Sequence, residues 1–339
     1  MGSSSRAIVI TNFGTNELKL IERPTPRPRR GEVLVNVRGA SLNFRDSEII
    51  RGAYHTRYQL PLVPLSDAAG TVVAVGDGVT RARVGDRVAP TFWRDWIAGD
   101  SAAALVDTTL GGPLDGVLAE DVVLDEQRIV HVPRHLSDVE AATLPCAGLT
   151  AWHALVTVGD LRPGDTVLIQ GTGGVAIFAL QLALMMNAIP IVMSSSDAKL
   201  ARAREMGAVH TLNYVETPEW QDQVLDLTNG RGVDHVVEVG GPRSFARSIQ
   251  AARIGGQIHV IGYLGGTSGE INPLDIFRRR LRVHGVSVGS RESFEAMNRA
   301  IEAARLRPVI DRAFAWTDVS DAVQHLDSRT HFGKVVLPF

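Results

Sequence analysis

The stretch Val167-Leu168-Ile169-Gln170-Gly171-Thr172-Gly173-Gly174-Val175-Ala176 decides the fold. It joins a short apolar run to a glycine turn and then to an apolar segment of helical length, 175–186. Gly171 permits a tight turn, Gly173 lets the backbone approach a ligand without a Cβ in the way, and small Ala176 allows close helix–strand packing. The spacing is G-x-G-x-x-A, in which a helix N-terminus offers free N–H groups to a pyrophosphate.

Around this turn, apolar strands alternate with segments of helical length. We expect strands at 166–169, 189–193, 233–239 and 257–261, and helices at 175–186, 198–206 and 243–253. Such alternation predicts a parallel sheet with helices on both faces, and strands buried on both faces are short apolar runs like these. The sequence therefore predicts an α/β, doubly wound Rossmann domain over 147–289, with a dinucleotide site at the glycine turn.

The flanking regions carry β-strand patterns. Val- and Ile-rich runs separated by Gly, Pro and Asn lie at 6–11, 17–21, 32–37, 70–75, 86–89 and 117–124. Residues 40–64 are less regular, with polar side chains among apolar ones, which is typical of a segment that lines a cleft. After an expected helix at 293–305, β character returns and ends in Lys334-Val335-Val336-Leu337. We expect β-rich structure in both flanking regions, 1–146 and 290–339.

Composition narrows the class of partner and the compartment. The formal net charge of the 339 residues is −2, which gives no basic face for nucleic acid. No stretch approaches the ~18 uninterrupted apolar residues of a membrane span. Cys146 is the one cysteine of the chain, so an internal disulfide framework is excluded. We expect a cytoplasmic protein that binds neither nucleic acid nor membrane and acts on a small molecule.

The end of the second Rossmann strand bears on the choice of cofactor. A site for NAD usually has Asp or Glu there, bonded to the ribose 2′-hydroxyl. Here the strand ends in hydroxyl side chains, Ser194, Ser195 and Ser196, with Lys199 and Tyr214 nearby. Hydroxyl donors and an ammonium suit a 2′-phosphate, so we expect NADPH in preference to NADH. Asp197 keeps NADH open, and the alternative is that the serines are a helix N-cap beside a surface lysine.

Several separate motifs make nearly the whole chain resemble the medium-chain dehydrogenase/reductase superfamily. They are Gly31-Glu32-Val33-Leu34-Val35, Gly70-Thr71-Val72-Val73-Ala74-Val75-Gly76, Val84-Gly85-Asp86-Arg87-Val88, Leu161-Arg162-Pro163-Gly164-Asp165 and Gly333-Lys334-Val335-Val336-Leu337. The resemblance implies that 1–146 and 290–339 form one GroES-like catalytic domain, interrupted in sequence by the Rossmann domain. By analogy with dimers of the superfamily, it also implies a homodimer in which strand 256–261 pairs across a two-fold axis.

The superfamily divides on zinc. Where zinc alcohol dehydrogenases carry a cysteine, this sequence has Asn43; where they carry a His-Glu pair, it has Ser66-Asp67. Cys146 alone matches a ligand position. One thiol and one carboxylate are too few for the three protein ligands of a catalytic zinc, and one cysteine cannot build the four-cysteine structural lobe. We therefore expect no zinc.

Without zinc, the chain resembles the quinone oxidoreductase branch. Asn43-x-x-Asp46 and Gly52-x-Tyr54 match the segment that those enzymes place beside the nicotinamide, which makes Asn43, Asp46 and Tyr54 the candidate catalytic residues. Glu48 departs from the pattern, because a second pocket tyrosine is usual there. The aromatics in 91–96 suggest either a wall for a bulky apolar or aromatic substrate or an ordinary packed flap. Tyr54 could equally be a cleft-wall aromatic without a proton role.

The expected cofactor contacts form three sets. The glycine turn supplies Gly171, Thr172, Gly173, Gly174 and Val175, and the end of the second strand supplies Ser194, Ser195, Ser196, Lys199 and Tyr214. The resemblance implies further contacts from Thr150, Val239, Gly240, Gly262, Tyr263, Ser287, Gly289, Arg291 and Lys334. For His55 and His153, a structural or surface role is favoured over a proton shuttle.

These residues favour hydride transfer from NADPH to a quinone, an enone or a related carbonyl. Hydride addition leaves negative charge on oxygen, which a conjugated acceptor spreads over more atoms. A zinc-free alcohol or secondary-metabolite dehydrogenase remains open, as does a non-catalytic NADPH-binding sensor or scaffold. The polar set Asn43, Asp46 and Tyr54 favours an enzyme, because a scaffold has no need of it.

Overall fold

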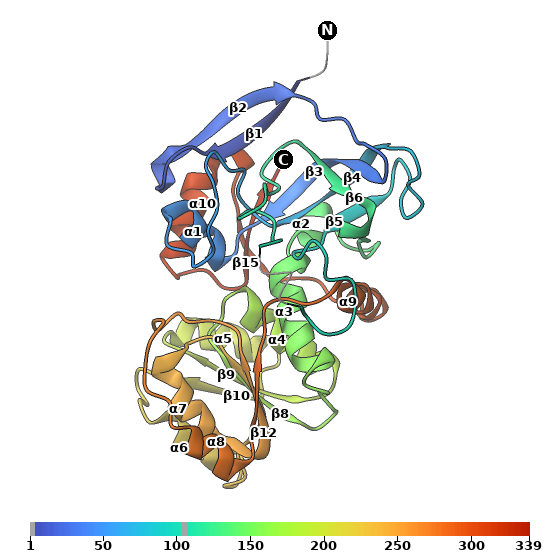
Figure 1. Cartoon of the computed structure of the whole chain (residues 1–339). Helices are drawn as coiled ribbons and strands as arrows, with labels where there is room; N and C mark the ends of the chain where they lie inside the picture. The colour runs from blue at the N-terminus through green and yellow to red at the C-terminus, as the bar shows by residue number, and fades with distance from the viewer. Residues whose placement is uncertain (1–3, 103–106) are drawn as a thin grey trace. The chain divides into compact units, whose positions relative to one another are not determined.

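The computed structural model describes residues 4–102 and 107–339. Contacts between Cα atoms divide the chain into two compact units, one made of Met1–Leu149 with Val288–Phe339 and the other of Thr150–Ser287. We call them the β-rich unit and the Rossmann unit. The chain enters and leaves the Rossmann unit once, so both ends of the sequence belong to the β-rich unit (Figure 1).

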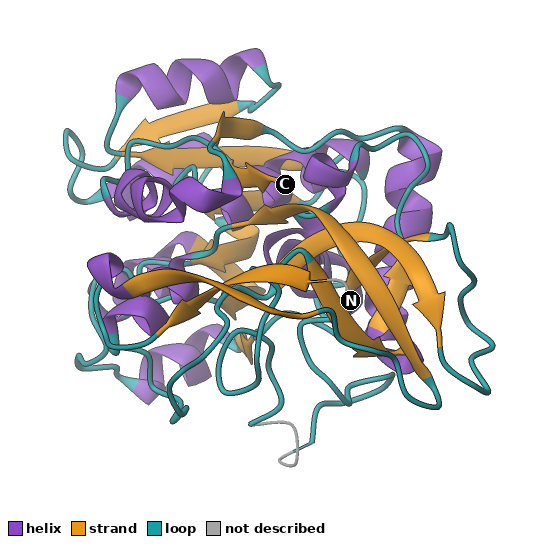
Figure 2. Ribbon diagram, turned by 90° about the horizontal axis from the view of Figure 1, so that it is seen from above, coloured by secondary structure: helices purple, strands orange, loops and turns teal. Residues whose placement is uncertain are grey.

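The β-rich unit is built on a seven-stranded sheet of the described residues. The strand order is β14-β15-β3-β4-β5-β7, and β6 also pairs with β3. The strands are β3 (Glu32–Ser41), β4 (Asp67–Val75), β5 (Arg87–Pro90), β6 (Asp121–Asp125), β7 (Ile129–His131), β14 (Ile310–Ala313) and β15 (Lys334–Pro338). Strands β1 (Ser4–Ile10) and β2 (Leu18–Pro24) form a separate antiparallel pair. Long, curved strands are prominent in the view from above (Figure 2).

Pairing between β15 and β3 places the last strand of the chain beside the segment that leads into α1 (Phe44–Arg51). Val336 is opposite Ser41, and the next residue of β15, Leu337, is opposite Ala40. Strand β3 is followed at once by α1, so Lys334 at the start of β15 lies beside Asn43. The other helices of this unit include α2 (Asp138–Ala141), α9 (Arg291–Ala304) and α10 (Val319–Asp327). Register in this sheet thus sets the position of Asn43 and Lys334.

The short helix α1 lies within the segment that the sequence marked only as irregular. Its N-cap is Asn43, whose backbone N–H donates to Asp46 Oδ2 at 2.7 Å, and a carboxylate there favours a helix start. It ends at Gly52, which has a φ of 72°. Arg45 and Asp46 are buried on this helix, so its buried face is not a simple apolar stripe and the sequence pattern did not predict a helix here.

The Rossmann unit contains a six-stranded parallel sheet among the described residues. Its order is β10-β9-β8-β11-β12-β13, which is the doubly wound order 3-2-1-4-5-6. The strands are β8 (Thr166–Gln170), β9 (Ile189–Ser194), β10 (His210–Asn213), β11 (Val233–Glu238), β12 (Ala252–Val260) and β13 (Arg282–Gly285). The helices include α4 (Gly174–Met185), α5 (Asp197–Glu205), α6 (Trp220–Leu227), α7 (Pro242–Ala251) and α8 (Pro273–Arg279). The doubly wound fold is as expected.

Two details differ from the expectations for this unit. The helix expected to reach residue 253 ends at Ala251, and β12 begins at Ala252. Strand β12 pairs with β11 on one side and with β13 on the other. The expected two-fold pairing through 256–261 is therefore wrong, because the backbone of an interior strand is already bonded on both sides. The edge strand at this end of the sheet is β13.

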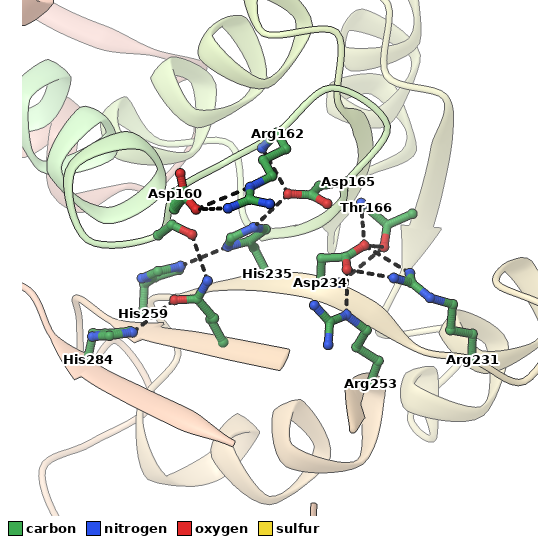
Figure 3. A network of polar contacts seen from close by, with 12 residues as sticks. Asp160, Arg162, Asp165, Thr166, Arg231, Asp234, His235, Arg253, His259 and His284 are labelled. Atoms are coloured by element: carbon green, nitrogen blue, oxygen red, sulfur yellow. Dashed lines mark hydrogen bonds and ion pairs between the residues drawn. The ribbon is translucent and has the colours of Figure 1, made fainter. Parts of the chain in front are cut away.

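A polar network ties the strands β8, β11, β12 and β13 together (Figure 3). Asp234 accepts hydrogen bonds from Arg231, Arg253 and Thr166. Burial raises the pKa of Asp234, but these hydrogen bonds outweigh it and lower the pKa from its usual value. Asp234 is therefore an ionised structural anchor of the sheet.

Three histidines stack across neighbouring strands of the same network. His235 and His259 have ring centroids 5.5 Å apart, and His259 and His284 have centroids 5.4 Å apart (Figure 3). Burial lowers the pKa of each of the three imidazoles, and that of His259 most clearly. The stack is therefore held in its neutral form. Within the described residues, no helix has both the length and the apolar character that a membrane crossing needs.

Candidate functional site

The glycine turn after β8 has the geometry of a phosphate cradle. Gly171 has a φ of 81°, which side chains with a Cβ rarely adopt. Its N–H donates to the carbonyl of Met193 at the end of β9, over 2.8 Å. Helix α4 then begins at Gly174, with Gly173 as N-cap and no side-chain cap on the first turn. The first N–H groups of α4 are thus available to a phosphate.

Loops at the ends of β11 and β12 lie side by side. Leu264 N–H donates to the carbonyl of Val239 at 3.1 Å, and Gly265 N–H donates to that of Gly240 at 2.8 Å. A Cβ on Gly262 would lie 2.9 Å from the carbonyl oxygen of Val239, so only glycine fits there. Strands β8 and β11 are neighbours at the point where the strand order reverses, which is where doubly wound sheets bind ligands.

Glu238, at the end of β11, is a residue that the sequence analysis missed. Its carboxylate is fully buried and accepts five hydrogen bonds. The donors are the backbone N–H groups of Gly240 and Gly241 and the side chains of Ser244, Gln170 and Ser248. Because Gln170 immediately precedes Gly171, the carboxylate connects the glycine turn to the loop at 239–241. An acid at the end of this strand, next to Val239-Gly240, was the signal available in the sequence.

The serines at the end of β9 are close to the other residues expected at a 2′-phosphate. Ser196 Oγ accepts from Lys199 N at 3.5 Å and caps α5, as the alternative interpretation foresaw. Tyr214 N–H donates to the carbonyl of Ser194 at 3.2 Å, and the Ser195 side chain is exposed. Asp197 Oδ1 accepts from the Asn213 amide at 2.9 Å. The structure therefore gathers Ser194–Ser196, Lys199 and Tyr214 around the end of β9.

The remaining predicted cofactor contacts divide between the two units. Thr150, which is buried, and the exposed Ser287 belong to the Rossmann unit. Gly289, Arg291 and Lys334 belong to the β-rich unit. Arg291 already donates its backbone N–H to Trp96 and its guanidinium to Gln127. Cofactor contact by these five residues stays a prediction.

A buried polar cluster in the β-rich unit joins positions that are far apart in the sequence. Lys334 Nζ donates to the carbonyl of Leu42 at 2.6 Å and to Asn43 Oδ1 at 2.7 Å, and it lies 3.8 Å from Asp67 Oδ2. Lys334 is only 2% exposed. Cys146 reaches the same group, because its backbone N–H donates to Asp67 Oδ2 at 3.3 Å. We call Asn43, Asp67, Cys146 and Lys334 the lysine cluster.

Beside the lysine cluster, Asp46 and Arg45 are also buried. Burial raises the pKa of Asp46 to about 6, against the lowering effect of Arg45. The Asp46 carboxylate accepts from the backbone N–H of Asn43, so it fixes the start of α1. A catalytic role for Asp46 stays a prediction.

The guanidinium of Arg45 lies near two aromatic rings, 5.1 Å from the ring centroid of Tyr54 and 4.8 Å from that of Phe92. Tyr54 also packs against His55, with ring centroids 4.2 Å apart. In the expected aromatic wall, Phe92 and Trp96 are buried. The continuation of that insertion at 103–106 lies outside the described residues. Phe92 thus packs as core, and Tyr54 is the half-buried aromatic of the candidate catalytic set.

Comparisons with known proteins agree with this geometry. The family model described as an alcohol dehydrogenase GroES-like domain matches residues 29–134, and the model described as a zinc-binding dehydrogenase matches residues 174–303. A zinc-type alcohol dehydrogenase-like protein of Schizosaccharomyces pombe is 40% identical over 331 residues, which cover 96% of each chain. The chain belongs to the medium-chain dehydrogenase/reductase superfamily. It is therefore an oxidoreductase of a superfamily that binds a nicotinamide cofactor.

Other relatives within the superfamily differ in name. Quinone oxidoreductase-like protein 2 of Bos taurus is 28% identical over 331 residues, which cover 94% of this chain and 88% of the relative. The structure of a Sinorhizobium meliloti protein described as an alcohol dehydrogenase has a TM-score of 0.94, with 42% identity and full coverage of both chains. A mycobacterial protein solved with NADPH has a TM-score of 0.81, with 26% identity and coverage of 99% and 100%. The expected GroES-like and Rossmann domains are confirmed.

The residues of the lysine cluster do not fit the catalytic zinc that one family description implies. The positions expected to replace the zinc ligands do converge, but Asn43 Oδ1 is bonded to an ammonium that also lies 3.8 Å from Asp67. Burial and the nearby Asp67 raise the pKa of the Cys146 thiol, which disfavours the thiolate that binds zinc. Among the residues that the structure describes, no group of three or more His, Cys, Asp and Glu side chains is placed to hold a metal ion.

Proposed function

We propose that this chain is a zinc-independent, NADPH-dependent reductase of quinones, enones or related conjugated carbonyl compounds. The observation that carries the proposal is the buried ammonium of Lys334, 2.7 Å from Asn43 Oδ1, where the positions of the zinc ligands converge. The two hydrogen bonds of this ammonium go to protein oxygens, and an ammonium does not bind a substrate oxygen as a Lewis-acidic metal does. The substrate itself must then spread the charge that hydride addition creates, and conjugated acceptors do so.

NADPH rather than NADH is the cofactor that the end of β9 favours. The exposed Ser195 hydroxyl, Lys199 and Tyr214 provide donors and positive charge for a 2′-phosphate. The nearest acid, Asp197, is engaged by the Asn213 side chain. The NADPH complex of the mycobacterial relative supports the same choice. When bound, the nicotinamide supplies the hydride.

The residues of the β-rich unit would divide the remaining tasks. The Asn43 amide donates a hydrogen bond to the acceptor oxygen, and Asp46 holds Asn43 at the start of α1. Tyr54, whose ring packs on Arg45, orients an apolar or aromatic acceptor. Water or Tyr54 delivers the proton that completes the reduction.

We also propose that two copies pair through β13, the edge strand, instead of 256–261. Exposed apolar side chains lie on β13 and on its neighbours β12 and α8; they are Val283, Ile254, Leu274 and Phe277. Phe277 is 76% exposed, and a group of exposed apolar side chains beside a sheet edge is a feature that a partner surface can cover. A homodimer in the cytoplasm is the expected form. Sedimentation of the parent chain as a monomer, with no change in Phe277→Ser, would reject the dimer.

The proposal is tested by following NADPH oxidation in excess chelator against paired conjugated acceptors and simple aldehydes. Turnover of quinones or enones alone, unaffected by the chelator, is the expected result. Turnover of aldehydes, or loss of activity on chelation, would support the alcohol dehydrogenase alternative. Tight NADPH binding with no turnover of any acceptor would support the sensor or scaffold alternative.

A further inference from the structure

Lys334 is a buried ammonium whose hydrogen-bond partners determine how the Asn43 side chain is oriented. An ammonium has three donors and no acceptor, so the Asn43 atom 2.7 Å from Nζ must be the carbonyl oxygen. The amide nitrogen is consequently the atom that faces away from Lys334. Chemistry thus settles the amide orientation, which geometry alone often leaves ambiguous.

The Asn43 amide nitrogen has no protein partner within the described part of the chain, although it is buried. Asn43 as a whole is 9% exposed. A buried N–H group without a partner is rare in native proteins and needs an explanation, such as a ligand that completes the site. Asn43 therefore carries a fixed donor that is available for a ligand.

The position of the Lys334 ammonium suits the orientation of the Asn43 amide better than an ion pair with Asp67. Its two shortest contacts, at 2.6 and 2.7 Å, are neutral oxygens of Leu42 and Asn43, whereas Asp67 is 3.8 Å away. The Asp67 carboxylate is already bonded by the hydroxyls of Ser41 and Ser66 and by the backbone N–H of Cys146. Charge balance for Asp67 alone would not require the contact between Lys334 and Asn43.

We propose that Lys334 is a positioning residue that takes over the metal's role by locking Asn43, so that the amide N–H donates to the substrate oxygen. The inference rests on the proposed reductase function and deepens it. With an enone, hydride forms the new C–H bond at the β carbon, the alkene electron pair moves toward the carbonyl carbon, and the carbonyl π pair moves to oxygen. The Asn43 N–H stabilises the resulting enolate oxygen, and a proton from water then completes the saturated ketone.

The experiment uses the full-length enzyme and four variants. Asn43→Ala removes the donor, and Lys334→Met removes the ammonium at nearly constant length. Lys334→Met combined with Asp67→Asn removes both charges, which keeps the test valid if an unpaired Asp67 prevents folding. Lys19→Met is the matched control, because it removes an ammonium from an exposed position on β2.

Each variant is assayed for kcat with a conjugated enone and for NADPH affinity. Removing one donor of this kind typically lowers kcat by about 100-fold, so we expect that loss in Asn43→Ala and a similar loss in the double variant. NADPH affinity should be unchanged in Asn43→Ala. Lys19→Met should match the parent enzyme. Recovery of kcat in the double variant would mean that Lys334 only balances the charge of Asp67, and the proposal would then be wrong.

A binding measurement separates this proposal from the proposed function. 4-Nitrophenol, whose phenolate is coloured, is titrated with and without NADP⁺ as a probe for an oxyanion. We expect the parent enzyme to lower the pKa of the bound phenol and Asn43→Ala and the double variant to abolish that shift. The shift without turnover of any acceptor would overturn the proposed function alone. An equal shift in the parent enzyme and both variants, or none in the parent enzyme, would overturn the role of Lys334.

Discussion

Gln170 and Glu238 end neighbouring parallel strands, and Gln170 Nε2 donates to Glu238 Oε2 over 2.7 Å. Each residue immediately precedes a loop that we expect to hold the cofactor, Gly171–Val175 in one case and Val239–Gly240 in the other. The buried pair therefore sets the spacing of two loops that the sequence places 68 residues apart. Because buried polar groups are costly to leave unpaired, this arrangement is strongly specified.

Glu238→Gln should weaken NADPH binding by about tenfold, because an amide has one acceptor oxygen where the carboxylate uses two. The N–H groups of Gly240 and Gly241 or the side chains of Gln170 and Ser248 then lose an acceptor. Fluorescence titration of NADPH measures the effect. Glu270→Gln, at an exposed position of the same unit, is the control, and equal affinities in the two variants would contradict the assigned role.

Lys199→Ala should weaken NADPH by about tenfold or more and leave NADH nearly unchanged, because a charge-assisted hydrogen bond to the 2′-phosphate is lost. Arg204→Ala removes a positive charge from a later turn of α5 and should affect both cofactors little. The same titration with both dinucleotides gives the answer. Equal losses for the two cofactors in Lys199→Ala would remove the basis for the NADPH assignment.

The histidine stack should make the Rossmann unit less stable as the pH falls. Burial lowers the pKa of His235, His259 and His284, so the unfolded chain binds more protons than the folded chain below the usual pKa of about 6.5. The free energy of unfolding then decreases as the pH falls from about 6.5 to the lowered pKa values of the folded state. Above about pH 6.5, the contribution of the neutral histidines to stability is fully present.

Chemical denaturation at a series of pH values measures this dependence. His259→Phe keeps a ring in the stack and removes the proton site, so the slope between neutral and acidic pH should become shallower. His210→Gln, on β10 at the other edge of the sheet, should keep the parent slope. A slope unchanged in His259→Phe would show that the stack does not govern the acid response.

Arg45→Met should lower the free energy of unfolding by roughly 2 kcal/mol or more, because buried acceptors lose their donor. The Arg45 guanidinium donates to the carbonyls of Leu110 and Gly112 at 3.0 and 2.9 Å. Arg51→Met, on the same helix, breaks an ion pair with Asp327 in which the arginine side chain is 44% exposed, and it should cost at most about 1 kcal/mol. Urea unfolding of both variants tests the contrast, and equal losses would contradict it.

Local patterns predicted much of the Rossmann unit. The apolar run before Gly171 became β8 and the apolar segment after it became α4, because strands buried on both faces need continuous apolar residues. Helix α1 could not be recognised in the same way. Its buried Arg45 and Asp46 are satisfied by carbonyls of residues 110 and 112 and by the backbone of Asn43, and these partners come from packing.

By itself, the sequence determined the two-domain α/β organisation, the glycine turn and the loss of the usual zinc ligands at Asn43 and Ser66. These are properties of residue type and spacing along the chain. The tertiary structure alone decided that Lys334 donates a hydrogen bond to Asn43 and that Gln170 donates one to Glu238. Both contacts depend on strand pairing, β15 with β3 and β11 with β8, which brings side chains together across a sheet whatever their separation in the sequence. Residue type determines which interactions a side chain can make, and sheet register determines which partner lies within its reach.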